Sequence, residues 1–103
     1  MRVEYKIHQV KRDLTRDFGF MGLQLLNSIG AEVSLANYNQ VYEGGIELNS
    51  KSDTLEILEK LFAKFNVHHP KDYYGHSMSV SDIVEINNKY YYCDSFGWTQ
   101  IEL

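Results

Sequence analysis

The chain has 103 residues, of which 44% are hydrophobic and 23% charged, the size and composition of one globular domain spanning residues 1–103. Its formal net charge of −4 argues against nonspecific binding to duplex DNA or to an anionic membrane, because such binding depends on Lys and Arg neutralising phosphates. The same charge is compatible with a partner that has a basic surface.

The sequence carries no sign of export or of membrane insertion. Residues 1–10 lack the apolar core of a signal peptide, and no stretch approaches the roughly 18 apolar residues that a membrane span requires. The only cysteine, Cys93, cannot form an internal disulfide, which fits a reducing compartment. We therefore expect a soluble, cytoplasmic protein.

The first half of the chain predicts a strand, a short helix and a second extended segment. Residues 2–10 alternate between apolar and polar side chains, which indicates a half-buried strand, and residues 11–17 form a polar connection. Residues 21–28 have helical spacing, and Gly30 suits the left-handed position that ends a helix. Residues 31–35 are a possible short strand, and residues 38–48 are predicted to be extended, with Gly44 and Gly45 at a turn or bulge.

The strongest helix is predicted over residues 52–65. Asp53 is a good N-cap, and Glu56 three residues later completes a capping-box pattern. An apolar stripe follows at helical spacing, and we interpret it as a core face. It consists of Leu55, Leu58, Leu61, Phe62 and Phe65.

The last third of the chain predicts a β-hairpin followed by a final strand. Residues 78–86 favour a strand with a bulge near Ser81 and Asp82, and Asn87-Asn88 is a two-residue turn that accepts positive φ. Such a turn pairs residues 83–86 with 89–92, and residues 98–103 can add another strand. The predicted fold class is α+β: a mainly antiparallel sheet with about two helices packed on one face.

The motifs of common enzymes and metal sites are missing. Neither a phosphate-binding glycine loop nor a paired zinc-ligand spacing occurs, although the chain has four histidines, including His68, His69 and His76. On paper, Cys93 and His76 could form a triad with Asp94 or Asp72, but a lone Cys in a strand is more often a small buried hydrophobe. We expect no catalytic residues, no metal and no cofactor.

A recognition surface is the alternative that the sequence favours. Tyr and Trp on loops give large contact areas at low entropic cost, and here they flank acidic residues around the last hairpin. The competing interpretation, that these rings complete a small core, is strong for Phe96 and Trp98. The candidate binding residues are Glu43, Asp72, Tyr73, Tyr74, His76, Asp94 and Trp98.

Several blocks of the chain together resemble the YodL-like family of small domains. They read NQVYEG at residues 39–44, FN at 65–66, HPKDY at 69–73, GHSMSVSDIV at 75–84 and YYCDSFGW at 91–98. The resemblance covers roughly residues 3–98, and the long block ending in DIV is specific. Cys93 stands where the family often has Val, and Ser81 where Gly is common, which weakens the idea of a catalytic Cys93.

The resemblance implies a context more than a chemistry. YodL-like domains occur in phage and conjugative-element proteins that help incoming DNA against host defences, and no catalytic residues are established for them. By this resemblance we expect a non-enzymatic inhibitor of a host defence protein with a basic nucleic-acid-binding surface, most concretely an anti-CRISPR protein acting on guide-RNA loading or DNA binding by a Cas9-type nuclease. The alternatives are a regulatory module that binds another host protein, such as a cytoskeletal one, and a small His/Asp/Cys hydrolase.

Overall fold

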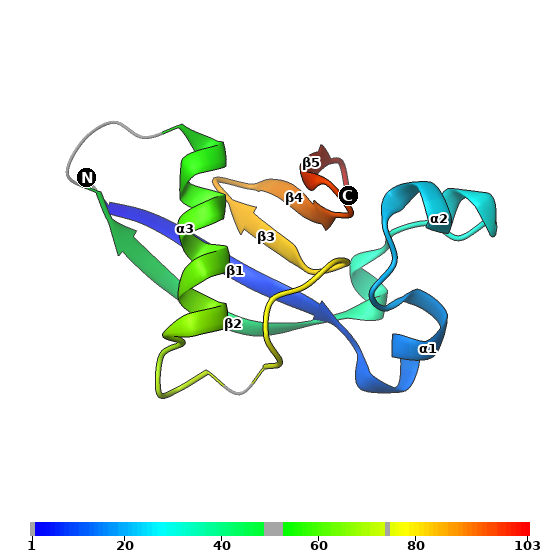
Figure 1. Ribbon diagram of the computed structural model, residues 1–103, viewed down its shortest axis with the longest axis horizontal. Helices are drawn as coiled ribbons and strands as arrows, with labels where there is room; N and C mark the ends of the chain where they lie inside the picture. Colours follow the sequence, from blue (N-terminus) through cyan, green and yellow to red (C-terminus); the bar gives the residue numbers. More distant parts are fainter. Residues whose placement is uncertain (1, 49–52, 74) are drawn as a thin grey trace.

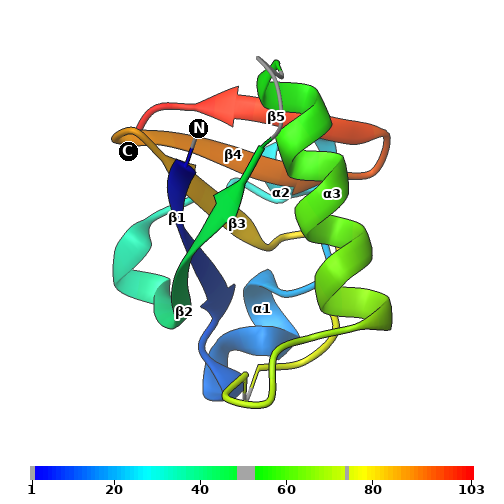
Figure 2. The same ribbon diagram turned by 90° about the vertical axis from the view of Figure 1, so that its left-hand side faces the viewer.

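The protein folds into a five-stranded antiparallel sheet with short helices around it (Figures 1 and 2). The structure is a computed structural model and describes residues 2–48, 53–73 and 75–103. The strands lie in the order β2-β1-β3-β4-β5, and every neighbouring pair is antiparallel. Their bounds are β1 Arg2–Val10, β2 Tyr38–Glu47, β3 Ile83–Ile86, β4 Lys89–Asp94 and β5 Gly97–Ile101. The predicted α+β class, with a terminal hairpin and a last strand, is confirmed.

Helical segments fill the connections between the strands. The segment after β1 forms a 3-10 turn, η1, over Arg12–Leu14 and a single helical turn, α1, over Thr15–Phe18. The helices α2 and α3 cover Leu23–Ser28 and Thr54–Val67, and a second 3-10 turn, η2, covers Leu35–Asn37. Among the described residues, no helix is both long and apolar enough to cross a membrane.

The C-terminal hairpin has the predicted register. Ile83 pairs with Tyr92, Val84 with Tyr91 and Ile86 with Lys89. The two turn residues have positive φ, 52° at Asn87 and 63° at Asn88, as a tight hairpin turn that matches the strand twist requires.

The helix α3 covers one face of the sheet (Figure 2). Asp53 caps it as predicted, because its carboxylate accepts a hydrogen bond from the Glu56 amide at 2.8 Å. Leu58, Leu61 and Phe65 are buried on the helix. They belong to one apolar cluster with Tyr5, Ile7, Leu48, Ile57, Tyr73, Met78, Val84 and Ile86.

The second helix packs on the opposite face, which differs from the expectation that both helices share one face. Ile83 and Tyr92 belong to a separate cluster with Leu26 of α2, whereas Val84 belongs to the α3 cluster. Neighbouring residues of a strand point to opposite sides, so β3 is buried on both faces. The sequence signal was the unbroken apolar pair Ile83-Val84, which alternation alone does not explain.

Two strand predictions are wrong: one strand does not form, and another begins later than expected. Residues 31–35 form no strand; there the chain turns into η2, where Ser34 Oγ accepts a hydrogen bond from the Ala36 amide. The strand expected from residue 78 begins only at Ile83, because Ser81 adopts φ 88° and the Asp82 amide bonds back to Ser79.

The irregularity expected at Gly44 and Gly45 lies elsewhere in β2. The register between β1 and β2 shifts between Ile7 and His8, so that Val41 is left unpaired. Gly44 instead provides room in a regular strand, since a Cβ there would lie 2.8 Å from a Tyr42 ring carbon and 3.1 Å from the Tyr5 hydroxyl.

Candidate functional site

The most unusual chemical feature of the molecule is the buried carboxyl group of Asp82, which is 0% exposed. Its Oδ2 accepts hydrogen bonds from Gln9 Nε2 and from the Ser79 amide, both at 3.0 Å. Its Oδ1 has no hydrogen-bond partner among the described residues and lies 3.9 Å from His76 Nε2. A carboxyl group that is only half satisfied and is out of contact with water is costly to ionise.

Burial accordingly raises the pKa of Asp82 from 3.8 to about 7. The Ser79 amide, His76 and Gln9 act in the opposite direction, because each favours the ionised form. Asp82 therefore changes its protonation state close to neutral pH, unlike an ordinary surface aspartate.

Gln9 and Tyr73 join this carboxyl group to the sheet and to the preceding loop. Gln9 is 3% exposed, and its Nε2 lies 2.9 Å from the Tyr73 hydroxyl and 3.0 Å from the carbonyl oxygen of His76. The Tyr73 hydroxyl donates to the same His76 carbonyl, and the His76 amide donates to Gln9 Oε1. These bonds fasten the loop that contains Tyr73 and His76 to the end of β1.

Both ring nitrogens of His76 are directed at groups of the protein itself. Nδ1 lies 2.6 Å from the Ser77 carbonyl oxygen, and Nε2 faces Asp82. The ring itself is partly exposed and packs against Phe20, with 5.6 Å between the ring centroids. Since each nitrogen is directed at a group of the protein itself, this arrangement suits a structural linkage better than a general base.

Cys93 has the environment of a core residue. It is 6% exposed, and its backbone continues the sheet through hydrogen bonds with Ser81 and Asp82. Burial, together with the carboxylates of Asp82 and Glu59, raises the pKa of the thiol to about 12, so the nucleophilic thiolate is disfavoured. In the described part of the chain, no group of three or more His, Cys, Asp or Glu side chains could hold a metal ion.

Of the candidate binding residues, Tyr73 is buried, Asp94 is partly buried and held by hydrogen bonds within the protein, and Tyr74 lies outside the described residues. Tyr73 is buried at 5% exposure in the α3 cluster, so its expected role at a surface is corrected. The Asp94 carboxylate is engaged in structure: it accepts hydrogen bonds from the Leu23 amide, the Ser95 amide and Thr99 Oγ1. Tyr74 lies outside the described residues.

Two other candidates, Asp72 and His76, are exposed in the connection between α3 and β3. Asp72 is exposed, and its carboxylate accepts a hydrogen bond from the Tyr42 hydroxyl at 3.2 Å. His76 is also exposed, at the Asp82 network.

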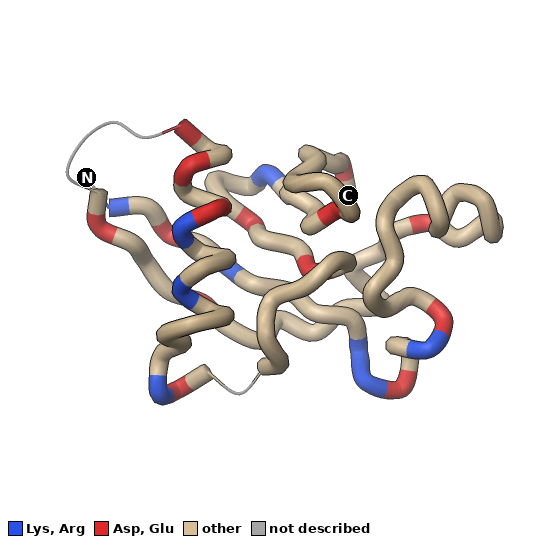
Figure 3. The backbone as a smooth tube through the Cα atoms, viewed as in Figure 1, with Lys and Arg blue, Asp and Glu red and all other residues tan. Residues whose placement is uncertain are grey.

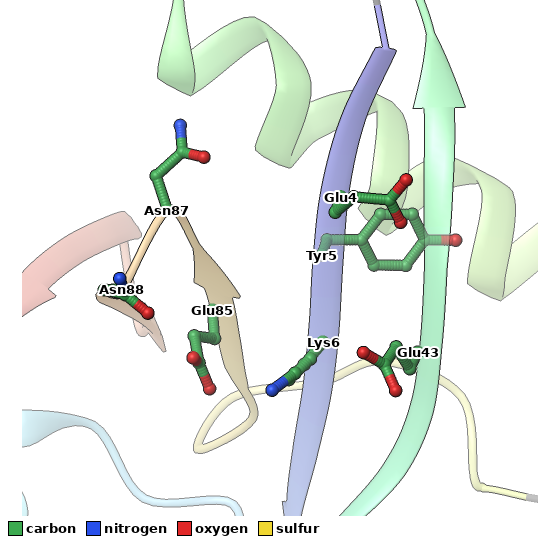
Figure 4. A pocket seen from close by; sticks show the side chains of 7 residues that line it. All are labelled: Glu4, Tyr5, Lys6, Glu43, Glu85, Asn87 and Asn88. Atoms are coloured by element: carbon green, nitrogen blue, oxygen red, sulfur yellow. The ribbon is translucent and has the colours of Figure 1, made fainter.

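Glu43 lies on the face of the sheet that α3 does not cover, in a hollow of about 290 Å³. Lys6 occupies its middle, opposite Glu43 on β2 and opposite Glu85 on β3. Figure 4 shows these side chains in front of the strands with the helix behind them, and Glu4 beside them. We define the acidic sheet face as Glu4, Lys6, Glu43 and Glu85. Of its three carboxylates, that of Glu4 also pairs with Arg2 at 2.7 Å and that of Glu85 with His8 at 3.0 Å.

Trp98 lies in a second hollow, of about 250 Å³, between α3 and the turn that joins β4 to β5. Its ring packs edge-on against Phe62, with 6.4 Å between centroids and 85° between the ring planes. Glu59 and Asp94 also line this hollow, which we call the Trp98 groove. The candidate binding residues that the structure describes are therefore spread over separate surfaces and form no single site.

The residues of the buried network were missed by reasoning from the sequence. Gln9 occupies an inward position of the β1 alternation, where a polar residue signals a buried hydrogen-bonding partner. Asp82 lies in the most specific sequence block, yet it was assigned only to a bulge.

These observations define a small α+β domain whose most specific sequence block builds a buried polar network. A family model for the YodL-like domain matches residues 4–103, almost the whole chain, and the protein belongs to that family. No significant similarity to a curated protein or to a solved structure was found.

Proposed function

We propose that this protein is a non-enzymatic inhibitor carried by a phage or plasmid, and that it binds a host defence protein on a basic nucleic-acid-binding surface. The most concrete partner is a Cas9-type nuclease, in which guide-RNA loading and target-DNA binding both depend on basic channels. The single observation that supports the proposal best is the acidic sheet face.

The acidic sheet face has the charge and the accessibility that such a partner requires. Glu4 and Glu43 are exposed, and Lys6 is the one basic residue among the described residues that line the hollow. At its border, Arg2 pairs with Glu4 at 2.7 Å and His8 with Glu85 at 3.0 Å. Within the described part of the chain, Glu43 is therefore the carboxylate of the hollow that faces Lys6 alone. The segment Lys11-Arg12-Asp13, by contrast, carries two basic residues and one acidic residue. Figure 3 shows the distribution of basic and acidic residues along the backbone. Carboxylates on a rigid sheet can take the place of nucleic-acid phosphates on a basic surface, and they accelerate association with it.

The surroundings of Cys93 and His76 support a binding function over the hydrolase alternative. A nucleophile needs a lowered pKa and a base within reach, whereas the pKa of the Cys93 thiol is raised. Both ring nitrogens of His76 are directed at Ser77 and Asp82.

The test is co-elution in gel filtration with a Cas9-type nuclease, loaded with guide RNA or free of it, together with a DNA-cleavage assay. We expect a complex that weakens as salt rises, and inhibition of cleavage. The double variant Glu4→Gln/Glu43→Gln should weaken the complex about tenfold or more, since it removes two charges from the acidic sheet face.

The matched control is Glu32→Gln/Glu102→Gln, which removes the same charge from exposed positions outside the hollow. Equal weakening by both double variants would contradict a role for the acidic sheet face. If no Cas9-type nuclease binds, capture from a bacterial lysate, with and without nuclease treatment, tests for another host protein. This experiment also covers the alternative in which the protein is a regulatory module. Recovery of a protein with no basic nucleic-acid surface would overturn the proposal.

A further inference from the structure

The Trp98 groove has a composition that the acidic sheet face lacks. It is lined by the apolar residues Phe62, Val80, Cys93 and Trp98 together with two carboxylate residues, Glu59 and Asp94. None of the described residues that line it is Lys or Arg.

The two carboxylates differ in freedom. Asp94 is fixed by hydrogen bonds from the Leu23 amide, the Ser95 amide and Thr99 Oγ1, so its charge is held in one place. Glu59 is exposed on α3 and can adjust its rotamer to a ligand. A fixed carboxylate and an adjustable one therefore line the same hollow.

The aromatic rings at the groove are only partly buried. Phe62 and Trp98 pack edge to face against each other, and both retain exposed surface. Phe96, in the turn between β4 and β5, is 100% exposed and does not line the groove. Exposed aromatic faces beside carboxylates are the surroundings in which a planar, weakly hydrated cation binds best.

We infer that the Trp98 groove binds an arginine side chain of a partner protein, with the guanidinium group between Glu59 and Asp94 and its aliphatic stem against Trp98. The volume of about 250 Å³ is below that of typical small-molecule pockets and suits one long side chain. Arginine fits better than lysine, because its planar group stacks on an indole ring and donates two parallel hydrogen bonds to a carboxylate. The inference goes beyond the proposed function, since a different surface carries it and it holds for any partner that offers an arginine.

Trp98 is the only tryptophan in the chain, so its fluorescence reports on this groove directly. The experiment titrates the full-length protein with a blocked Gly-Arg-Gly peptide, with the lysine peptide and with the peptide that contains neutral citrulline. Backbone NMR shifts of Ser95 and Gly97 provide a second readout if the emission does not respond. We expect saturable binding of the arginine peptide, at least threefold weaker binding of the lysine peptide, and no measurable binding of the citrulline peptide.

Glu59→Gln should weaken the binding of the arginine peptide about three- to tenfold. Glu56→Gln, the same change one turn earlier on the exposed side of α3, should leave this binding unchanged. Equal binding of the three peptides, an equal effect of the two variants, or no binding by either readout would overturn the inference. The outcome is independent of the nuclease assay: peptide binding without co-elution supports the groove alone, and co-elution without peptide binding supports the proposed function alone.

Discussion

His76 and Asp82 face each other at the boundary between solvent and core. Their nearest polar atoms, Nε2 and Oδ1, are 3.9 Å apart, while the His76 side chain is 45% exposed and that of Asp82 is fully buried. A buried acid next to an exposed base makes the local structure sensitive to pH, because the ionised acid has few other partners.

The first prediction concerns the pH dependence of stability through Asp82. The folded protein holds this proton up to about pH 7, whereas the unfolded chain releases it near pH 3.8. The free energy of unfolding therefore falls as the pH rises from about 4 to about 7, by up to about 4 kcal/mol through this group, and it levels off above pH 7. Asp82→Asn removes the effect, because the amide cannot ionise.

Urea unfolding of the parent protein and of Asp82→Asn between pH 4 and pH 8 measures this pH dependence of the free energy of unfolding. The stability of Asp82→Asn relative to the parent should increase steadily across this window and then stay constant. Other carboxyl groups titrate alike in both proteins, so they cancel in the difference. A difference that does not change with pH would show that Asp82 ionises normally.

The second prediction concerns Gln9. Gln9→Leu removes one of the two hydrogen bonds to Asp82 Oδ2, the bond to the Tyr73 hydroxyl and the acceptor of the His76 amide, and we expect a loss of about 2–4 kcal/mol in the free energy of unfolding. Gln40→Leu, at an exposed position on β2, is the matched control and should change stability by less than about 0.5 kcal/mol. Similar losses in the two variants, measured by urea denaturation, would contradict the network.

The third prediction concerns the hairpin turn. Asn88 has φ 63°, a conformation that glycine adopts freely and a β-branched residue resists. Asn88→Gly should leave stability unchanged or raise it by a few tenths of a kcal/mol, whereas Asn88→Val should lower it by about 1–2 kcal/mol. Thermal unfolding followed by circular dichroism distinguishes them, and equal melting temperatures would refute this account of the turn.

The fourth prediction concerns the reactivity of Cys93. With its pKa raised to about 12 and only 6% of its surface exposed, the thiol should react with iodoacetamide at pH 8 more than about a hundredfold slower in the folded protein than in urea. Mass spectrometry of samples quenched over time gives both rates. Rapid modification of the folded protein would reopen the hypothesis of a nucleophilic cysteine.

The sequence was most informative where a pattern is local. The strand β1, the Asp53 cap and the Asn87-Asn88 turn each depend on residues within a few positions, and the structure confirms all three. The half-buried alternation holds only in the first part of β1, because residues 7–10 are all buried, His8 included. Because a two-residue turn fixes the register, the pairs between β3 and β4 followed directly.

The candidate site was less predictable because it depends on contacts between distant segments. Gln9 and Asp82 are 73 positions apart, and the sequence around either residue does not indicate that the two form a hydrogen bond. Tyr73 was expected at a surface for its polar tip, but its hydroxyl reaches Gln9 and the His76 carbonyl inside the protein. Because both faces of β3 are covered, the alternation of apolar residues does not indicate which residues of this strand pack against which helix.

The pairing of β1 has a consequence for biosynthesis. This strand forms one ladder with β2, which ends at Glu47, and the other with β3, which begins at Ile83. On a ribosome, an early β1–β2 ribbon must wait for dozens of further residues before its open side is covered. Until then it exposes unpaired backbone groups to other nascent chains, so the protein is most prone to misassembly before translation reaches the hairpin.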